Sequence, residues 1–288
     1  MELGLAMKDP SSELVRRIAP LAEDRGFRSL LFPELSIVGT ARITGRDPFI
    51  SAAIALESTE ELRAGPGVVG TVFHTPRHLA LRAATLAEAS GGRFILGCGV
   101  SHRAYAHEIG VDYPDSPMEH IRSYLDQLAA ENERLAFGGP PAPTWLAALG
   151  DRMAAVGTEL ADGLLLNWIA PAWVGRTIQH LQSTVGHRPT VAVYLRVDTD
   201  EGLRRQAETY LTMFDNYARH FARQGLSSVE EIVAATGVPI DDPGVLRSRV
   251  DAYRDAGTDV LILYPADVDG TGIERFVEST DVHAVGGE

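Results

Sequence analysis

Hydrophobic residues along this chain alternate between short continuous runs and longer stretches in which they recur every three or four positions. The runs have the length of buried strands, and the stretches have the spacing of amphipathic helices. Eight strands are predicted, at residues 3–7, 29–32, 62–69, 93–97, 144–149, 163–167, 190–197 and 260–264. Helices are predicted between them, at residues 11–25, 48–56, 76–90, 117–135, 152–161, 172–185, 201–224 and 245–256.

Eight such β/α units in 288 residues predict a (β/α)8 TIM barrel formed by a single domain, residues 1–288. The strands are apolar along nearly their whole length, which favours parallel pairing with both faces buried. A doubly wound open sheet is the alternative. The barrel is favoured because Gly97-x-Gly99-x-x-His102 follows the fourth strand, not the first, and lacks the third glycine of a dinucleotide fingerprint. Residues 225–243 form an insertion before the last helix and strand, either over the active-site mouth or at a subunit contact.

A glycine-rich turn after the fourth predicted strand is the clearest candidate ligand site. Gly97 and Gly99 lie just past the carboxyl end of this strand, which pairs in parallel with the preceding one across a helix. Ligands bind at that edge of an α/β fold, and a backbone without side chains can approach them closely; the plainer alternative is that these glycines only turn the chain. Cys98 between them is interpreted as a packing residue, since the spacing implies no neighbouring base.

Polar residues at other strand ends complete the expected catalytic face. Lys8 and Glu34 follow the first two strands, and His74 precedes a helix start; a solvated loop lysine, a structural ion pair and a surface histidine are the respective alternatives. Ser101 and His102 are the best candidates to touch a cofactor or substrate. A histidine with its ordinary pKa near 6.5 suits proton transfer, although Ser101 as the N-cap of the next helix explains the pair about as well.

The turn after the fifth strand is a candidate phosphate site. Gly150, Asp151, Arg152 and Met153 open the helix predicted there. Free N–H groups at a helix start attract a phosphate, and Arg152 would add a charge-assisted contact. Asp151 offers the alternative that its carboxylate caps the helix and occupies the same donors.

Composition narrows the class of protein. The formal net charge of −13 argues against nucleic acid as a partner, and no apolar run approaches the ~20 residues of a membrane span. The start of the chain lacks the pattern of a secretory signal, so a cytoplasmic enzyme is expected. No metal-site pattern and no Gly-x-Ser-x-Gly elbow occurs, and a hydride-transferring cofactor fits this inventory better. Trp168 and Tyr264, at strand ends, predict a partly hydrophobic substrate pocket, with core packing as the alternative.

Several motifs together resemble one known family. They are the segment from Glu13 to Glu34, Gly45-Arg46-Asp47-Pro48-Phe49, the segment from Arg63 to His102 with its Leu-Gly-x-Gly-Val-Ser-His turn, Trp145 to Gly163, and Ala256-Gly257-Thr258-Asp259. In this order they resemble the bacterial luciferase-like oxidoreductases, and most closely an actinobacterial branch that depends on coenzyme F420. The resemblance covers nearly the whole chain. It implies a flavin or deazaflavin cofactor, a small-molecule substrate and a homodimer.

The resemblance also implies roles for particular residues. Similar proteins bind the coenzyme phosphate at the turn that corresponds to Gly150. They hold a non-prolyl cis peptide, here Gly67–Val68, against the back of the deazaflavin ring. Glu34 stands where they carry a buried polar residue near the coenzyme. Some relatives have a catalytic glutamate directly after the glycine turn, and Val100 in that position argues against a mechanism that needs it.

The leading hypothesis is an F420-dependent oxidoreductase. Hydride would pass between C5 of the deazaflavin and an electron-poor C=C, C=N or C=O bond, with His102, assisted by Ser101 or Glu34, supplying the proton. An FMN-dependent monooxygenase on the same barrel is the first alternative, and a cofactor-less binding or partner subunit is the second.

Overall fold

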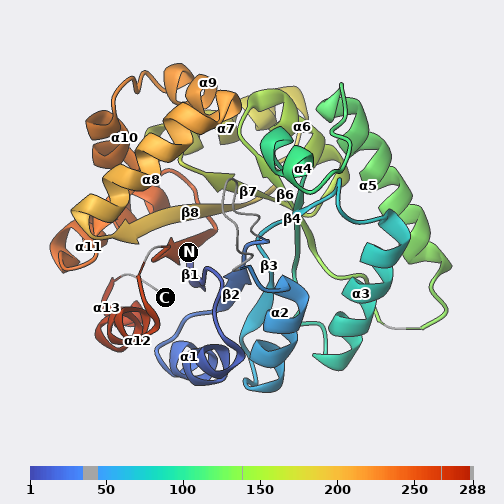
Figure 1. Cartoon of the computed structure of the whole chain (residues 1–288), viewed down its shortest axis with the longest axis horizontal. Coiled ribbons are helices and arrows are strands. Elements are labelled where there is room, and N and C mark those ends of the chain that lie inside the picture. The colour runs from blue at the N-terminus through green and yellow to red at the C-terminus, as the bar shows by residue number, and fades with distance from the viewer. Residues whose placement is uncertain (35–44, 138, 267, 286–288) are drawn as a thin grey trace.

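The computed structural model describes residues 1–34, 45–137, 139–266 and 268–285, and its strands form a parallel barrel (Figure 1). They follow the order β3-β2-β1-β10-β8-β7-β6-β5-β4, and every pair is parallel. Barrel strands are β1 (Glu2–Ala6), β2 (Ser29–Phe32), β3 (Arg63–Pro66), β4 (Val69–Gly70), β5 (Leu96–Gly99), β6 (Thr144–Ala148), β7 (Gly163–Asn167), β8 (Thr190–Asp198) and β10 (Val260–Tyr264).

The two ends of this strand order meet, which closes the barrel. β3 and β4 are successive parts of one strand that the Gly67–Val68 peptide interrupts. A parallel bridge between Ala64 of β3 and Phe94 joins this strand to the chain entering β5. With β3 and β4 counted as one strand, eight parallel strands form the barrel in the described part of the chain. The predicted TIM-barrel fold is therefore confirmed.

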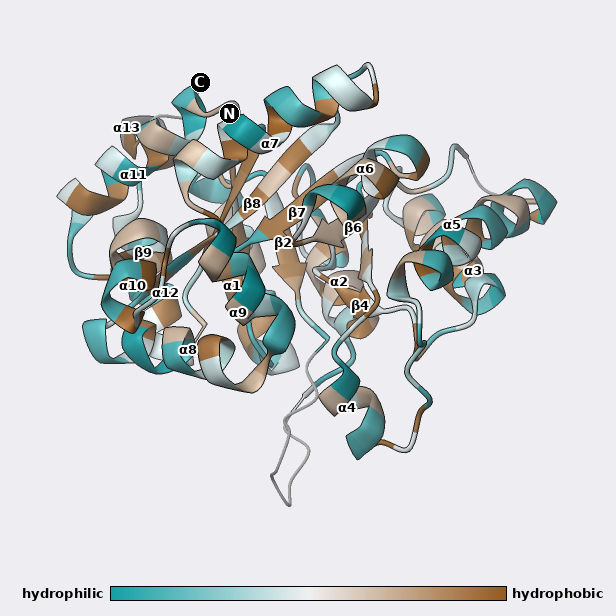
Figure 2. Ribbon diagram, turned by 90° about the horizontal axis from the view of Figure 1, so that it is seen from above, coloured by the Kyte–Doolittle hydropathy of each residue, from teal (hydrophilic) through white to brown (hydrophobic). Residues whose placement is uncertain are grey.

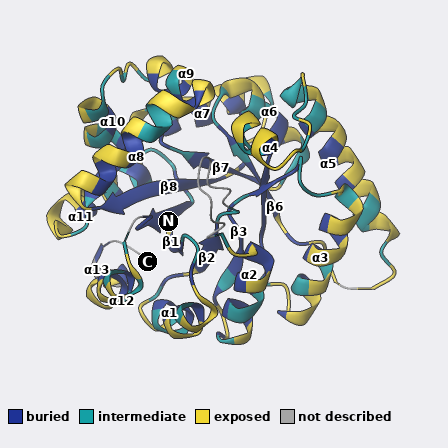
Figure 3. Cartoon of the chain, in the orientation of Figure 1, coloured by how far each residue is buried: buried dark blue, intermediate teal, exposed yellow. Residues whose placement is uncertain are grey.

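Helices form the outer wall of the barrel. They are α1 (Ser12–Asp24), α2 (Pro48–Glu57), α3 (Pro76–Ala89), α4 (Arg103–Glu108), α5 (Pro117–Arg134), α6 (Asp151–Leu160), α7 (Pro171–Thr184), α8 (Asp200–Met213), α9 (Asp215–Arg223), α10 (Val229–Thr236), α11 (Pro243–Asp255), α12 (Gly270–Ser279) and α13 (Val282–Val285). The strands are buried, whereas the helices expose their outer faces (Figure 3). The hydropathy colouring follows the same division, with brown strands and teal outer helix faces (Figure 2). No described helix is long and apolar enough to cross a membrane.

Two strand predictions need correction. The strand predicted over residues 62–69 is interrupted by the cis Gly67–Val68 peptide, which the apolar pattern of this run does not reveal. The strand predicted over residues 93–97 lies instead at Leu96–Gly99, with only the Ala64–Phe94 bridge before it. The glycine turn is thus the end of the strand itself rather than a loop after it.

The helix predicted over residues 201–224 is two helices. Phe214 takes an extended conformation (φ −129°, ψ 100°) between α8 and α9, and its side chain is buried. Burial of a large aromatic ring compensates for the backbone hydrogen bonds lost at the break. Residues 225–243, whose role the sequence left open, form α10 and a short strand, β9 (Gly237–Pro239). β9 pairs with the last residues of β8, so the insertion supports that strand end.

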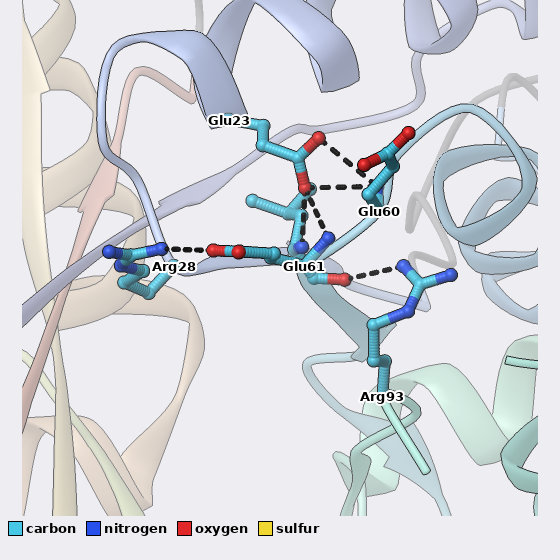
Figure 4. Close-up of polar contacts among 6 residues, drawn as sticks. Glu23, Arg28, Glu60, Glu61 and Arg93 are labelled. Carbon is cyan, nitrogen blue, oxygen red and sulfur yellow. Dashed lines mark hydrogen bonds and ion pairs between the residues drawn. The ribbon is translucent and has the colours of Figure 1, made fainter. Parts of the chain in front are cut away.

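At the end of the barrel opposite the predicted catalytic face, a polar network holds the start of β3 (Figure 4). The carboxylate of Glu23 accepts hydrogen bonds from the backbone N–H groups of Glu60, Glu61 and Leu62 at 2.6 to 3.1 Å. Arg93 donates to the Leu62 carbonyl at 3.0 Å. Burial alone would raise the pKa of Glu23, but the three N–H donors outweigh it and lower the pKa below its usual value.

Candidate active site

A cavity of about 580 Å³ opens at the carboxyl ends of the strands, a size typical of small-molecule and cofactor sites. Nine of the predicted site residues line it: Glu34, Gly67, Val68, Gly99, Ser101, His102, Gly150, Met153 and Tyr264. Six predicted residues lie outside its lining: Lys8, His74, Gly97, Asp151, Arg152 and Trp168. The predicted residues that line the cavity thus lie together at the carboxyl ends of the strands, and the other six lie outside its lining.

The cis Gly67–Val68 peptide forms a bulge in one wall of the cavity. The Tyr194 hydroxyl donates a hydrogen bond to the Gly67 carbonyl, and a Cβ at Gly67 would lie 2.3 Å from that hydroxyl. From behind, Gly97 makes room for the bulge, since a Cβ there would lie 2.3 Å from the Pro66 carbonyl oxygen. Gly97 is therefore a close-packing glycine rather than a cofactor contact, which corrects its predicted role.

Glu34 reaches the cavity beside this bulge. Its Oε2 accepts a hydrogen bond from the Gly70 N–H at 2.8 Å, and its Oε1 lies 2.8 Å from Nε2 of His74. His74 lies behind Glu34, with Nδ1 3.5 Å from the guanidinium of Arg82. The prediction that His74 lines the pocket is thus wrong. Its imidazole instead orients a carboxylate that does line it.

His102 lies against aromatic rings at the cavity wall. Its ring centroid is 4.3 Å from that of Phe214 and 5.2 Å from that of Tyr105. Burial lowers the pKa of His102 to about 4, so the imidazole is neutral at pH 7. One nitrogen of a neutral imidazole donates a hydrogen bond and the other accepts one, and the lowered pKa removes the imidazolium fraction that a pKa near 6.5 would supply.

The helix-cap alternative for this pair is not observed. His102, not Ser101, is the N-cap residue of α4, and its side chain makes no capping hydrogen bond. Ser101 has a positive φ of 82°, a conformation that is rare for residues other than glycine. Such a backbone conformation is found preferentially at functional sites, where surrounding structure maintains it.

The start of α6 has free backbone donors. Gly150 is its N-cap and no side chain caps the helix, so the capping alternative for Asp151 is not observed. Asp151 and Arg152 are exposed and line neither the cavity nor the hollow beside it. Instead Arg219 and Arg223 of α9 face this turn. The Arg223 guanidinium donates to the Leu149 carbonyl, and a Cβ at Gly150 would lie 2.7 Å from its Nη1.

We call the space between these groups the outer hollow; its lining is Leu149, Gly150, Asn216, Arg219, Ala222 and Arg223. It shares Leu149, Gly150, Asn216 and Arg219 with the cavity, so the two are adjoining. A helix N-terminus and two guanidinium groups make this a positively polarised region. Sequence reasoning missed both arginines because they are some 70 positions from Gly150 along the chain.

The floor of the cavity carries a buried cation at a strand end that the sequence placed on the catalytic face without assigning it a role. Arg196, at the end of β8, is 3% exposed and lines the cavity. Its Nη2 donates to Asn167 Oδ1 at 3.1 Å, and its guanidinium lies 4.3 Å from the ring centroid of Tyr264. Asn167 in turn donates from Nδ2 to the Tyr217 hydroxyl at 2.9 Å. The signal in the sequence is an arginine inside the apolar run of residues 190–197.

Trp168 and Cys98 belong to the packed interior. Trp168 is fully buried with a φ of 53°, and its ring packs against Tyr210 and Phe221 at 5.5 and 6.0 Å. The core-packing alternative for Trp168 is therefore correct, and its assignment to the substrate pocket is wrong. Cys98 is fully buried, and burial raises the pKa of its thiol to about 12, which agrees with the packing interpretation.

Comparison with known proteins gives matches over most of this chain. The structure superposes on an F420-dependent secondary alcohol dehydrogenase in complex with an F420–acetone adduct, with a TM-score of 0.76, 15% identity and 98% of each chain covered. It also superposes on the oxygenating constituent of 3,6-diketocamphane monooxygenase from Pseudomonas putida, in complex with FMN. That match has a TM-score of 0.69 and 17% identity, and covers 98% of each chain. At these identities the likeness establishes the fold alone.

A curated relative is the 5,10-methylenetetrahydromethanopterin reductase of Archaeoglobus fulgidus, 26% identical over 163 residues that cover 51% of this chain and 47% of the reductase. The chain spans about half the length of the first curated relatives it matches. The model of the luciferase-like monooxygenase family matches residues 5–260, which is most of the sequence. The chain therefore belongs to the luciferase-like monooxygenase family.

Proposed function

We propose that this protein is an F420-dependent oxidoreductase that transfers a hydride between the deazaflavin and a small organic substrate. The observation that carries the proposal is that the cavity and the outer hollow adjoin each other. A cavity with a glycine bulge in its wall adjoins an outer hollow with an uncapped helix start and two arginines. The first suits a flat ring, and the second suits an anionic tail.

The described residues fit each part of this cofactor. The bulge at Gly67–Val68 offers a surface of backbone and one small side chain to a planar ring. Gly99 also lines the cavity, and it adds backbone without a side chain to the wall. The free N–H groups after Gly150 suit a phosphate, because the positive end of the α6 dipole favours an anion there.

The outer hollow favours F420 over FMN. FMN ends in a single phosphate, whereas the tail of F420 continues past its phosphate into carboxylates. Arg219 and Arg223 lie beyond the α6 start and would pair with such carboxylates. The fold by itself does not decide, since it accommodates F420 in one solved structure and FMN in another.

When bound, the deazaflavin would supply the hydride chemistry at C5. The chain's own residues would position the partners and handle the proton. Glu34, held by His74 and by the Gly70 N–H, is oriented to accept or deliver a proton at its carboxylate. The neutral His102 would hydrogen-bond a substrate oxygen or nitrogen, since its lowered pKa keeps it from acting as a cation.

Fluorescence titration of the purified protein with F420 and, separately, with FMN tests the proposal. We expect F420 to bind more tightly, and the Arg219→Met/Arg223→Met double variant to bind it about tenfold more weakly, as loss of charge-assisted contacts predicts. Arg152→Met is the matched control, because Arg152 is exposed and lies outside the outer hollow. This variant should bind F420 as tightly as the wild type does. Tighter binding of FMN would replace the proposal with the monooxygenase alternative. Binding of neither would favour the cofactor-less subunit.

A further inference from the structure

Arg196 is a buried cation that forms no ion pair with a carboxylate among the residues the structure describes. It is 3% exposed, and two of its five N–H donors meet protein acceptors, Gln206 Oε1 at 3.4 Å and Asn167 Oδ1 at 3.1 Å. Its Nε has no hydrogen-bond partner, and within the described ranges no ion pair joins Arg196 to a carboxylate. Buried charges are ordinarily paired, so this one stands out.

The guanidinium nevertheless stays charged. Burial works to lower the pKa of Arg196, but its electrostatic interactions with the surrounding tyrosines, Tyr210 and Tyr264 first, outweigh burial and raise the pKa. Aromatic faces provide a further partial compensation, with ring centroids of Tyr264, Trp168 and Tyr210 at 4.3, 5.0 and 5.4 Å from the guanidinium carbon. Neither replaces an anion, because a guanidinium binds a carboxylate through two parallel hydrogen bonds.

The nearest carboxylate along β8, that of Asp198, hydrogen-bonds to groups other than Arg196. Asp198 accepts hydrogen bonds from Gln206 Nε2 at 2.8 Å and from the Thr199 N–H at 2.7 Å. Gln206 therefore stands between Asp198 and Arg196, contacting both. The net charge of the chain is −13, so anions are not attracted by the protein as a whole. Any preference for an anion must come from local groups such as this one.

The cavity around Arg196 is aromatic on several sides. Tyr194, Tyr264, Phe214 and Tyr217 line it together with the arginine. Rings of this kind pack against a flat ligand by stacking or edge contact. The floor thus combines apolar ring surfaces with one cation that has no carboxylate partner in the described part of the chain.

We propose that the substrate is a planar organic carboxylate, whose carboxylate group pairs with Arg196 while its aromatic or conjugated body packs among these rings. The inference rests on the proposed function, because it assigns the substrate class of the same cavity. A substrate of this class supplies the missing counter-charge, so its binding replaces an uncompensated buried cation with a bidentate ion pair.

Calorimetric titration of the cofactor-free protein with benzoate and with benzamide tests this inference, since the two probes share size and shape and differ in charge. We expect benzoate to bind at least about tenfold more tightly than benzamide. In Arg196→Met the preference should fall to within about twofold. Arg103→Met is the matched control, because Arg103 is an exposed arginine at the same cavity, and it should keep the preference.

A second variant guards against a failure of Arg196→Met to fold. Asn167→Asp keeps the shape of the side chain and places a carboxylate next to Arg196, where the amide oxygen now lies 3.1 Å from Nη2. It should abolish the benzoate preference while leaving the arginine in place. Equal binding of the two probes by the wild type, or a preference that persists in both variants, overturns the inference.

Repeating the titration with F420 present separates this inference from the proposed function. Benzoate should bind alongside F420, as a substrate must. Displacement of benzoate by F420 would show that Arg196 serves the coenzyme, and the inference would be wrong. If F420 does not bind but the Arg196-dependent preference remains, the anion site is supported and the proposed cofactor is refuted.

Discussion

Acidification should destabilise this protein through His102 more than through an ordinary histidine. In the unfolded chain His102 takes up a proton below its usual pKa of 6.5, whereas in the folded protein burial delays protonation until about pH 4. The unfolded state therefore binds more protons throughout this window. The resulting stability is fully present above pH 6.5 and is lost progressively as the pH falls toward 4.

The lowering of the pKa from 6.5 to about 4 corresponds to a stability difference of about 3 kcal/mol across the whole window. Because the unfolded state is already protonated at pH 5 and the folded state is not, about 2 kcal/mol of it is lost by that pH. The physical source is burial of the imidazole, whose ring packs against Phe214 and Tyr105.

Urea unfolding at pH 7.5 and at pH 5 gives the measurement. Between these values the wild type should lose about 2 kcal/mol more stability than His102→Gln, which has no imidazole to titrate at this position. His180→Gln is the control, since His180 is exposed on α7, and it should follow the wild type. His220, which burial also shifts downward in pKa, is common to all three proteins and cancels. Parallel losses in the wild type and His102→Gln would refute the reasoning.

Three further predictions concern the frame of the barrel. In urea melts, Glu23→Gln should lower the free energy of unfolding by about 1–2 kcal/mol at pH 7. Asp24→Asn, at an exposed position, should leave the free energy of unfolding unchanged. The stability difference between wild type and Glu23→Gln should be complete above pH 4.5 and vanish as the pH falls through the lowered pKa of Glu23. Gly97→Ala should lower the free energy of unfolding by more than about 2 kcal/mol, because its Cβ would lie 2.3 Å from a backbone oxygen. Gly91→Ala has open space around it and a φ of +64°, so in the same melts it should lower the free energy of unfolding by about 1 kcal/mol. Cys98 should resist thiol reagents in the native protein and react fully in urea; rapid native labelling would contradict its burial and its pKa of about 12.

The barrel itself was predictable because its signals are local. Apolar runs and helical spacing are properties of short windows, and eight of each leave few architectures to consider. The face of the site was predictable for the same reason, since every parallel strand ends at one edge. The interruption between β3 and β4 was not, because the apolar pattern continues through Gly67–Val68, and only family resemblance indicated the cis peptide there.

Side-chain direction at the strand ends was the part that the sequence did not determine. Trp168 and Arg196 both lie at the carboxyl ends of predicted strands. The tryptophan side chain nevertheless packs into the interior, whereas the arginine side chain lines the cavity. The positive φ of Trp168 redirects the chain directly after β7, which no pattern of apolar residues reveals. An arginine inside a buried strand was the more informative signal. A buried charge needs a compensating partner, and a ligand bound in a cavity can provide one.

The break at Phe214 connects most of the features that local patterns missed. In a continuous helix successive residues are about 100° apart, so Tyr217 and Arg219 would keep the direction set by α8. The extended residue resets that direction. It places the Phe214 ring on His102, brings the Tyr217 hydroxyl to Asn167, and sets Arg219 beside the start of α6. One non-helical residue thereby forms part of the cavity wall, packs on the histidine whose pKa burial lowers, and orients the helix that carries both arginines of the outer hollow.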